Sequence, residues 1–125
     1  MIALDSSSLI AYLSGSKGDD VDAVEFALRE KQAVLPPVVL SELLSDPKLS
    51  PATAGVFKEL PCLPLLEGYW ERVGYFRSEV IRGSRKAPLA DALIAQSCMD
   101  HDIPLITRDG DFRNFRRAGL KLLPV

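Results

Sequence analysis

The sequence has 125 residues, of which 47% are hydrophobic and 26% are charged, proportions typical of a globular protein. This length predicts a single domain over residues 1–125 that buries its own core without disulfides. The formal net charge of −2 argues against a protein that holds nucleic acid over its whole surface.

Neither a secretion signal nor a membrane segment is indicated. The stretch Met1–Asp5 has no basic residue, and no apolar run approaches the roughly eighteen residues of a membrane helix. Cys62 and Cys98 lie far apart and in no metal-ligand spacing, so we expect two buried free thiols rather than a disulfide. We therefore expect a cytoplasmic protein.

The first thirty residues predict one strand and two helices. The apolar strand Ile2–Leu4 ends at Asp5, and Ser6–Ser8 offers the N-cap of a short helix. Asp19 or Asp20 caps a second, amphipathic helix whose apolar residues recur at helical spacing.

The next segment predicts a strand followed by two helices. The strand Ala33–Leu35 ends at a pair of prolines that begin the helix Val38–Leu44. Glu42 stands in this almost wholly apolar helix, and it either lies exposed at the helix edge or points inward toward a cation. Ser50-Pro51 begins another helix that reaches about Leu60.

The second half predicts three more strands. Cys62–Leu66 is expected as an edge strand because of Pro64, and a long helix follows over about Gly68–Arg82, with Trp70 and Phe76 in its apolar stripe. Further predicted elements are the helix that begins near Asp91, the strand Pro104–Thr107, a short helix around Phe112–Arg117 and the strand Leu120–Leu123. Strands that alternate with helices predict an α/β fold in which helices cover both faces of a parallel sheet of about five strands.

Two acidic sites in this half each allow two interpretations. Asp91 lies in the first turn of its helix, where a carboxylate favours the helix dipole, but it shares a face with the apolar Ile94 and Cys98. Asp109-Gly110-Asp111 is compatible with a plain turn, yet it directly follows an apolar strand.

Four acids follow strands or begin helices in a way that predicts a common site. In an open α/β sheet the carboxyl ends of neighbouring strands share one edge, which would gather Asp5, Glu42, Asp91 and Asp109. Two carboxylates about 5 Å apart repel by roughly 3 kcal/mol at an effective dielectric near 20. A bound divalent cation offsets this repulsion, and ligation by oxygen alone selects Mg²⁺ or Mn²⁺.

Other chemistries find little support. The single histidine, His101, lies in a helix-to-strand turn where we expect it to face solvent, and no serine nucleophile motif is present. Carboxylate-bound Mg²⁺ instead suits phosphodiester hydrolysis. Basic residues precede and follow the helix of Asp91 in sequence. Their charge pattern alone favours solvated helix faces. They are Arg72, Arg77, Arg82, Arg85 and Lys86 before it, and Arg108, Arg113, Arg116, Arg117 and Lys121 after it.

Four segments, taken in order, resemble the motifs of PIN domains, specifically the VapC-type toxins of toxin–antitoxin pairs. They are Ile2–Ile10, Leu35–Leu44, Ala90–Ala95 and Leu105–Phe112. The resemblance covers nearly the whole chain and implies a three-layer α/β/α sandwich and an endoribonuclease that depends on Mg²⁺ or Mn²⁺. It also implies a homodimer and a cognate antitoxin protein that covers the active site.

The same resemblance assigns roles to the matching residues. Asp5 and Asp91 would be the principal metal ligands, and Glu42 and Asp109 would complete the acidic pocket. Asp111 would be a neighbouring or substitute fourth acid. The polar positions Ser7 and Thr107 match those that hydrogen-bond the pocket acids in the family.

Three other classes of protein are alternatives to a VapC-type toxin. A phospho-receiver domain needs a lysine after its last strand, but Lys121 lies within the last predicted strand. A DEDD-type exonuclease needs a second acid two residues after the first, and this position is Ser7. The remaining alternative is a PIN-like module that binds RNA or protein without cleaving it, and the complete acidic set argues against it.

Overall fold

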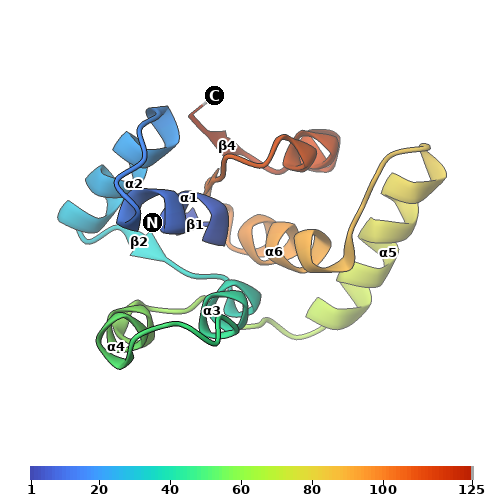
Figure 1. The fold of residues 1–125 in the computed structure, drawn as a ribbon. Helices are drawn as coiled ribbons and strands as arrows, with labels where there is room; N and C mark the ends of the chain where they lie inside the picture. The colour runs from blue at the N-terminus through green and yellow to red at the C-terminus, as the bar shows by residue number, and fades with distance from the viewer. Residues whose placement is uncertain (125) are drawn as a thin grey trace.

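Four short parallel strands form one sheet in the computed structural model, which describes residues 1–124 (Figure 1). The order across the sheet is β2-β1-β3-β4, and Ala3 pairs with Val34 on one side of β1 and with Leu105 on the other. The centre of the sheet is therefore β1 with β3 beside it. The strands are β1 (Ile2–Leu4), β2 (Ala33–Val34), β3 (Leu105–Ile106) and β4 (Leu122–Leu123).

Helices connect these strands and cover both faces of the sheet. The connection from β1 to β2 and the connection from β2 to β3 cross the sheet in opposite directions, so right-handed crossovers put their helices on opposite faces. No helix within residues 1–124 is both long and apolar enough to span a membrane. The helices are α1 (Ser6–Leu13), α2 (Asp19–Arg29), α3 (Pro37–Leu44), α4 (Pro51–Glu59), α5 (Tyr69–Arg82), α6 (Leu89–Asp100) and the 3₁₀ helix η1 (Gly110–Ala118).

This arrangement confirms the predicted α/β/α fold, with one strand fewer than expected. The predicted strand Cys62–Leu66 is wrong, because its pairing with the sheet is a single parallel bridge between Leu35 and Cys62. Two backbone hydrogen bonds hold that bridge, and Pro64, which has no N–H to donate, follows directly. Cys62 lies exposed there, contrary to expectation, whereas Cys98 is buried and both thiols are free.

Four further local expectations differ from the structure. The N-cap of α1 is Asp5 rather than one of the serines, and the N-cap of α2 is Gly18 rather than an aspartate. Trp70 is 63% exposed, and its neighbour Tyr69 is buried in its place and donates its hydroxyl to the carbonyl of Leu93 at 2.6 Å. His101 is only partly exposed, because its Nε2 lies 2.8 Å from the carbonyl oxygen of Pro64.

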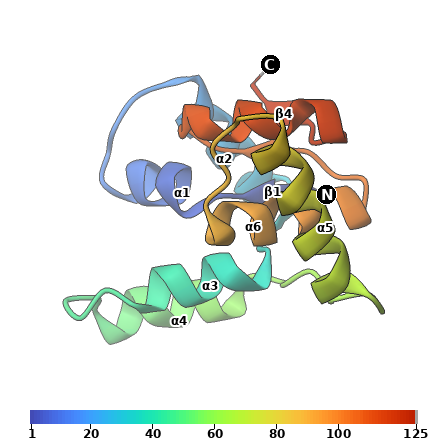
Figure 2. The ribbon, with the colours of Figure 1, turned by 90° about the vertical axis from the view of Figure 1, so that its right-hand side faces the viewer.

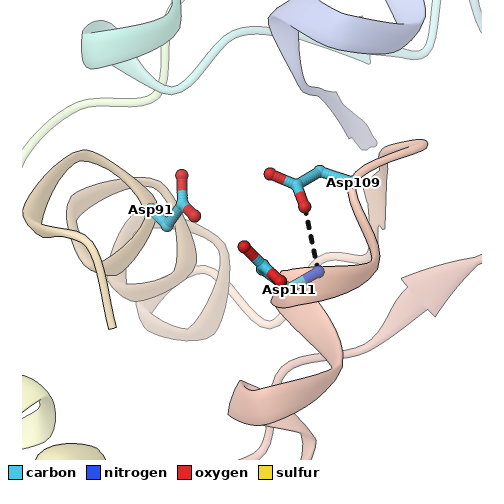
Figure 3. A group of neighbouring side chains, drawn as sticks. All are labelled: Asp91, Asp109 and Asp111. Atoms are coloured by element: carbon cyan, nitrogen blue, oxygen red, sulfur yellow. Dashed lines mark hydrogen bonds between the residues drawn. The ribbon is translucent and has the colours of Figure 1, made fainter. Parts of the chain in front are cut away.

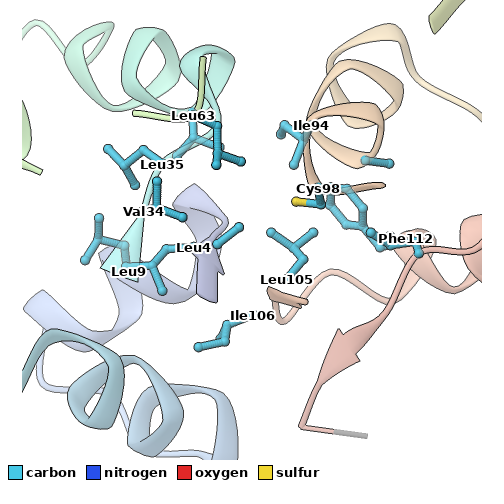
Figure 4. Close-up of a cluster of buried hydrophobic side chains, with 14 of the residues drawn as sticks. Leu4, Leu9, Val34, Leu35, Leu63, Ile94, Cys98, Leu105, Ile106 and Phe112 are labelled. Atoms are coloured by element: carbon cyan, nitrogen blue, oxygen red, sulfur yellow. The ribbon is translucent and has the colours of Figure 1, made fainter. Parts of the chain in front are cut away.

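The core lies between the sheet and the helices on its two faces (Figure 4). The residues of β2 and β3 are fully buried, as expected where helices cover both faces of a parallel sheet, whereas both residues of the edge strand β4 are only partly buried. Figure 2 shows α5 extending beside α6, and these two helices pack through Tyr69 and Ala92. The core therefore holds β1, β3 and α6 together, which fixes the positions of the acids that follow the two strands and begin the helix. Labelled core residues in Figure 4 include Leu4, Leu35, Ile94, Leu105, Ile106 and Phe112.

Candidate metal centre

The candidate site lies where the neighbouring strands β1 and β3 end. Asp5 directly follows β1, and its backbone N–H donates to the carbonyl of Ile106, the last residue of β3, at 2.9 Å. The loop after β3 leads to Asp109 and the first turn of η1. Helix α6 packs its buried face on the core through Ile94 and Cys98, which turns Asp91 toward the same edge. Parallel strand ends of this kind are where open α/β sheets bind ligands.

Three carboxylates converge at this edge. Asp91, Asp109 and Asp111 each offer an oxygen, and these three oxygens lie within 4.8 Å of one another. Figure 3 shows Asp91 reaching from α6 toward the two acids on the opposite side. The backbone N–H of Asp111 donates to Asp109 Oδ1 at 2.9 Å, so Asp109 caps η1 while it takes part in this acidic trio. This segment is therefore both a turn that begins η1 and a part of the acidic trio.

Asp5 is a buried acid held by two hydroxyl groups. It is 5% exposed, and Ser7 Oγ and Thr107 Oγ1 both donate to its Oδ2 at 2.7 Å. Thr107 Oγ1 also accepts the backbone N–H of Asp109 at 3.0 Å, which ties the Asp5 carboxylate to the turn of the acidic trio. Because both hydroxyls contact Oδ2, this oxygen is satisfied and Oδ1 is the one left for another ligand.

Glu42 approaches Asp5 from α3. Its side chain is exposed at the helix edge, and Ser6 Oγ donates to its Oε1 at 3.4 Å. Partial desolvation raises the pKa of Glu42, and the charge of Asp5 raises it further. Glu42 therefore takes the first of its two expected placements, exposed at the helix edge, with its carboxylate near that of Asp5. Neither it nor Asp5 belongs to the 4.8 Å trio within residues 1–124.

The pKa of Asp91 reflects desolvation and the charges of all the acids at this edge. Its pKa is raised to about 6, first by desolvation and then by the charges of the other four acids, with Asp109 the largest of these. A carboxylate in this position is destabilised by its neighbours unless a proton or a cation joins it. The donors are all carboxylate oxygens, which fit a hard dication such as Mg²⁺ or Mn²⁺.

Two of the basic residues that flank the acids in sequence, Arg108 and Lys86, form ion pairs near the site that sequence reasoning did not predict. Arg108 donates from Nε and Nη2 to the two carboxylate oxygens of Asp20 at 2.9 and 3.1 Å, and Ser8 adds a third bond to this aspartate. Lys86 Nζ lies 3.2 Å from Asp111 Oδ2. A signal for the first pair existed, because Asp20 shares a buried helix face with Val24 at i+4.

The Asp20–Arg108 pair anchors the loop of Thr107 and Asp109 to α2. We expect Asp20→Asn to lower the free energy of unfolding by about 2 kcal/mol, the scale of hydrogen bonds to charged groups. Hydrogen bonding from Arg108 lowers the pKa of Asp20, so its contribution is present at neutral pH and is lost as the pH falls below about 4. Urea unfolding at pH 7 and pH 3 measures this difference, with the exposed Asp19→Asn as the matched control. Equal stabilities of both variants at pH 7 would contradict the anchoring role.

Comparison with known proteins identifies the fold independently. A family model described as PIN domain matches residues 2–118. No curated protein sequence matches the chain. The crystal structure of FitAcB from Neisseria gonorrhoeae is similar with a TM-score of 0.70 at 20% identity, covering 98% of this chain and 96% of that one.

Two further structures share the fold. FitAB bound to an IR36 DNA fragment has a TM-score of 0.72 at 21% identity, covering 98% of this chain and 94% of that one. VapBC2 from Rickettsia felis, bound to a DNA fragment from their promoter, has a TM-score of 0.70 at 18% identity, with 98% and 97% covered. At these identities the likeness shows the fold alone.

Proposed function

The chain belongs to the PIN domain family, and from this premise we propose that it is a metal-dependent endoribonuclease, the toxin of a toxin–antitoxin pair. The observation that carries the proposal is the acidic trio with Asp5 held beside it at one sheet edge. Such a group of carboxylates is unfavourable without a cation, and phosphodiester hydrolysis is the chemistry that a carboxylate-bound dication serves. We assign this function to a single domain over residues 1–125.

In this proposal Asp5 and Asp91 are the principal ligands of Mg²⁺ or Mn²⁺, and Glu42, Asp109 and Asp111 complete the acidic pocket. A bound ion would activate water and neutralise charge on the phosphate. The protein contributes positioning: Ser7 and Thr107 orient the carboxylate of Asp5 through two short hydrogen bonds. The cap on η1 fixes Asp109 and Asp111 relative to each other.

The similar structures support one part of this proposal, an antitoxin partner. FitAB and VapBC2 are bound to DNA fragments, and the VapBC2 fragment comes from their promoter. By analogy, we propose that a cognate antitoxin binds this chain, that the chain forms a homodimer and that it acts on RNA in the cytoplasm.

The direct test is cleavage of total cellular RNA by the purified protein. We expect discrete cleavage products with Mg²⁺ or Mn²⁺ and none in excess chelator, because the carboxylates alone supply no electrophile. Mapping the new RNA ends identifies the substrate. Intact RNA under all metal conditions would instead favour a PIN-like module that binds RNA or protein without cleaving it.

Expression in cells tests the toxin assignment separately. We expect growth arrest on expression of the wild-type chain and relief on co-expression of the protein encoded beside it. Unimpaired growth at a verified high level of soluble wild-type protein would contradict the toxin role while leaving the cleavage assay to decide the enzyme activity.

A further inference from the structure

Helix η1 presents three rows of side chains, because a 3₁₀ helix repeats every three residues. One row is the buried pair Phe112 and Phe115, which anchors the helix to the core at 1% and 0% exposure. The other two rows point to different sides of this anchor. The first of them is Gly110, Arg113 and Arg116, and the second is Asp111, Asn114 and Arg117.

The first exposed row lines a cavity of about 260 Å³ that adjoins the acidic trio. Thr107 and Asp109 form its end nearest the candidate metal centre, and the β4 segment Leu122–Pro124 supplies an apolar wall. The second exposed row faces away from it, since Asn114 and Arg117 line a separate cavity beside α5. The arginine row therefore begins at Gly110, directly after Asp109 of the trio, which lines the same cavity.

Among the residues that the structure describes, the arginines of this row are not paired with an acid, although three aspartates also line the cavity. Arg108, at the cavity rim, is bound to Asp20, but Arg113 and Arg116 form no ion pair within residues 1–124. Arg113 lies against the turn of the trio, because a Cβ added at Gly110 would be 3.5 Å from its Nη1. The Arg113 guanidinium therefore lies beside Gly110, at the end of the cavity nearest the trio.

We propose that this cavity binds the RNA strand next to the cleaved bond, with Arg113 and Arg116 each contacting a backbone phosphate; the proposal rests on the function proposed above. Guanidinium groups bind phosphate oxygens through two parallel hydrogen bonds. Residues three apart on a 3₁₀ helix lie about 6 Å apart along its axis, so the two groups contact successive phosphates. The apolar wall of Leu122–Pro124 packs against a sugar or base.

The test is the affinity for a short fluorescein-labelled oligouridylate, measured by fluorescence anisotropy in chelator on the Asp91→Asn background. Chelator and substitution both prevent cleavage, so binding is measured alone. We expect Arg113→Gln with Arg116→Gln to weaken binding on the order of tenfold and to reduce the salt slope by about 1.4, from two contacts of about 0.7 each. The matched control is Arg117→Gln, which removes the same charge from the opposite row of η1 and should change little.

The outcomes separate this proposal from the nuclease function. If the wild type cleaves RNA with metal but the double variant binds like the Arg117→Gln control, the phosphate site is refuted and the nuclease stands. If the double variant loses RNA binding selectively but the wild type cleaves nothing, the site is supported and the chain binds RNA without cutting it. Loss of antitoxin binding with unchanged RNA binding would make the cavity a protein site and overturn the proposal.

Discussion

Asp91→Asn is expected to abolish metal-dependent RNA cleavage, by about a thousandfold or more, while the fold stays intact. Loss of several kcal/mol of charge stabilisation at the reacting phosphate corresponds to such a factor, at about 1.4 kcal/mol per tenfold. Asp91 is the acid on which the charges of Asp5, Glu42, Asp109 and Asp111 all act, so it lies at the centre of the group. Asparagine keeps its shape and one oxygen but removes the negative charge that binds a dication.

The measurement is the initial rate of cleavage of the mapped RNA at saturating metal. Asp22→Asn is the matched control, because this exposed aspartate on α2 loses the same charge far from the acidic edge. Circular dichroism and the unfolding midpoint establish that the variant is folded. Asp5→Asn serves as a second variant, and undiminished cleavage by both it and Asp91→Asn would refute the metal centre.

The second large effect concerns stability in the absence of metal. The pKa of Asp91 is about 6 in the folded protein, against about 3.9 in an unfolded chain. The folded state therefore binds more protons between these values, and stability must fall as the pH rises from about 4 to above 6. After discounting for partial exposure, this loss is on the order of 1 kcal/mol. The raised pKa of Glu42 acts in the same direction.

Removing the charge of Asp91, or binding a metal ion in the acidic pocket, should reverse this loss of stability. At pH 7 in chelator we expect Asp91→Asn to be more stable than the wild type by about 1 kcal/mol, and below about pH 4, where Asp91 is protonated in both states, we expect the difference to disappear. Saturating Mn²⁺ should stabilise the wild type by about 2.7 kcal/mol at a hundred times its dissociation constant, and the variant much less.

Urea unfolding across pH, with and without metal, checks this expectation. The carboxylates whose pKa is lowered, Asp20 and Asp100, give a separate loss of stability below about pH 4 and do not confuse the comparison. Equal stabilisation of both proteins by Mn²⁺ would mean that the ion binds away from Asp91, contrary to the proposed site.

Periodicity and turn chemistry were enough to predict most of the fold. The apolar runs Ile2–Leu4 and Ala33–Leu35 specify strands locally, and the helical spacing of apolar residues after Asp19 specifies a helix. The order of these elements then limits the topology to a parallel sheet with right-handed crossovers. Cys62–Leu66 failed as a strand because Pro64 has no N–H to donate, so its pairing with the sheet stops at a single bridge.

The sequence also predicts one part of the candidate site, and the tertiary structure decides the rest. Because period and chain order place Asp5, Asp91 and Asp109 at strand ends and a helix start, the sequence alone determined that an acidic edge would form. Only the tertiary structure decided that Asp109 and Asp111 both join Asp91, since one cap bond holds both acids in the same turn. It also decided that Arg108 binds Asp20 while Arg113 does not, because contacts between groups 88 residues apart depend on packing that no local pattern encodes.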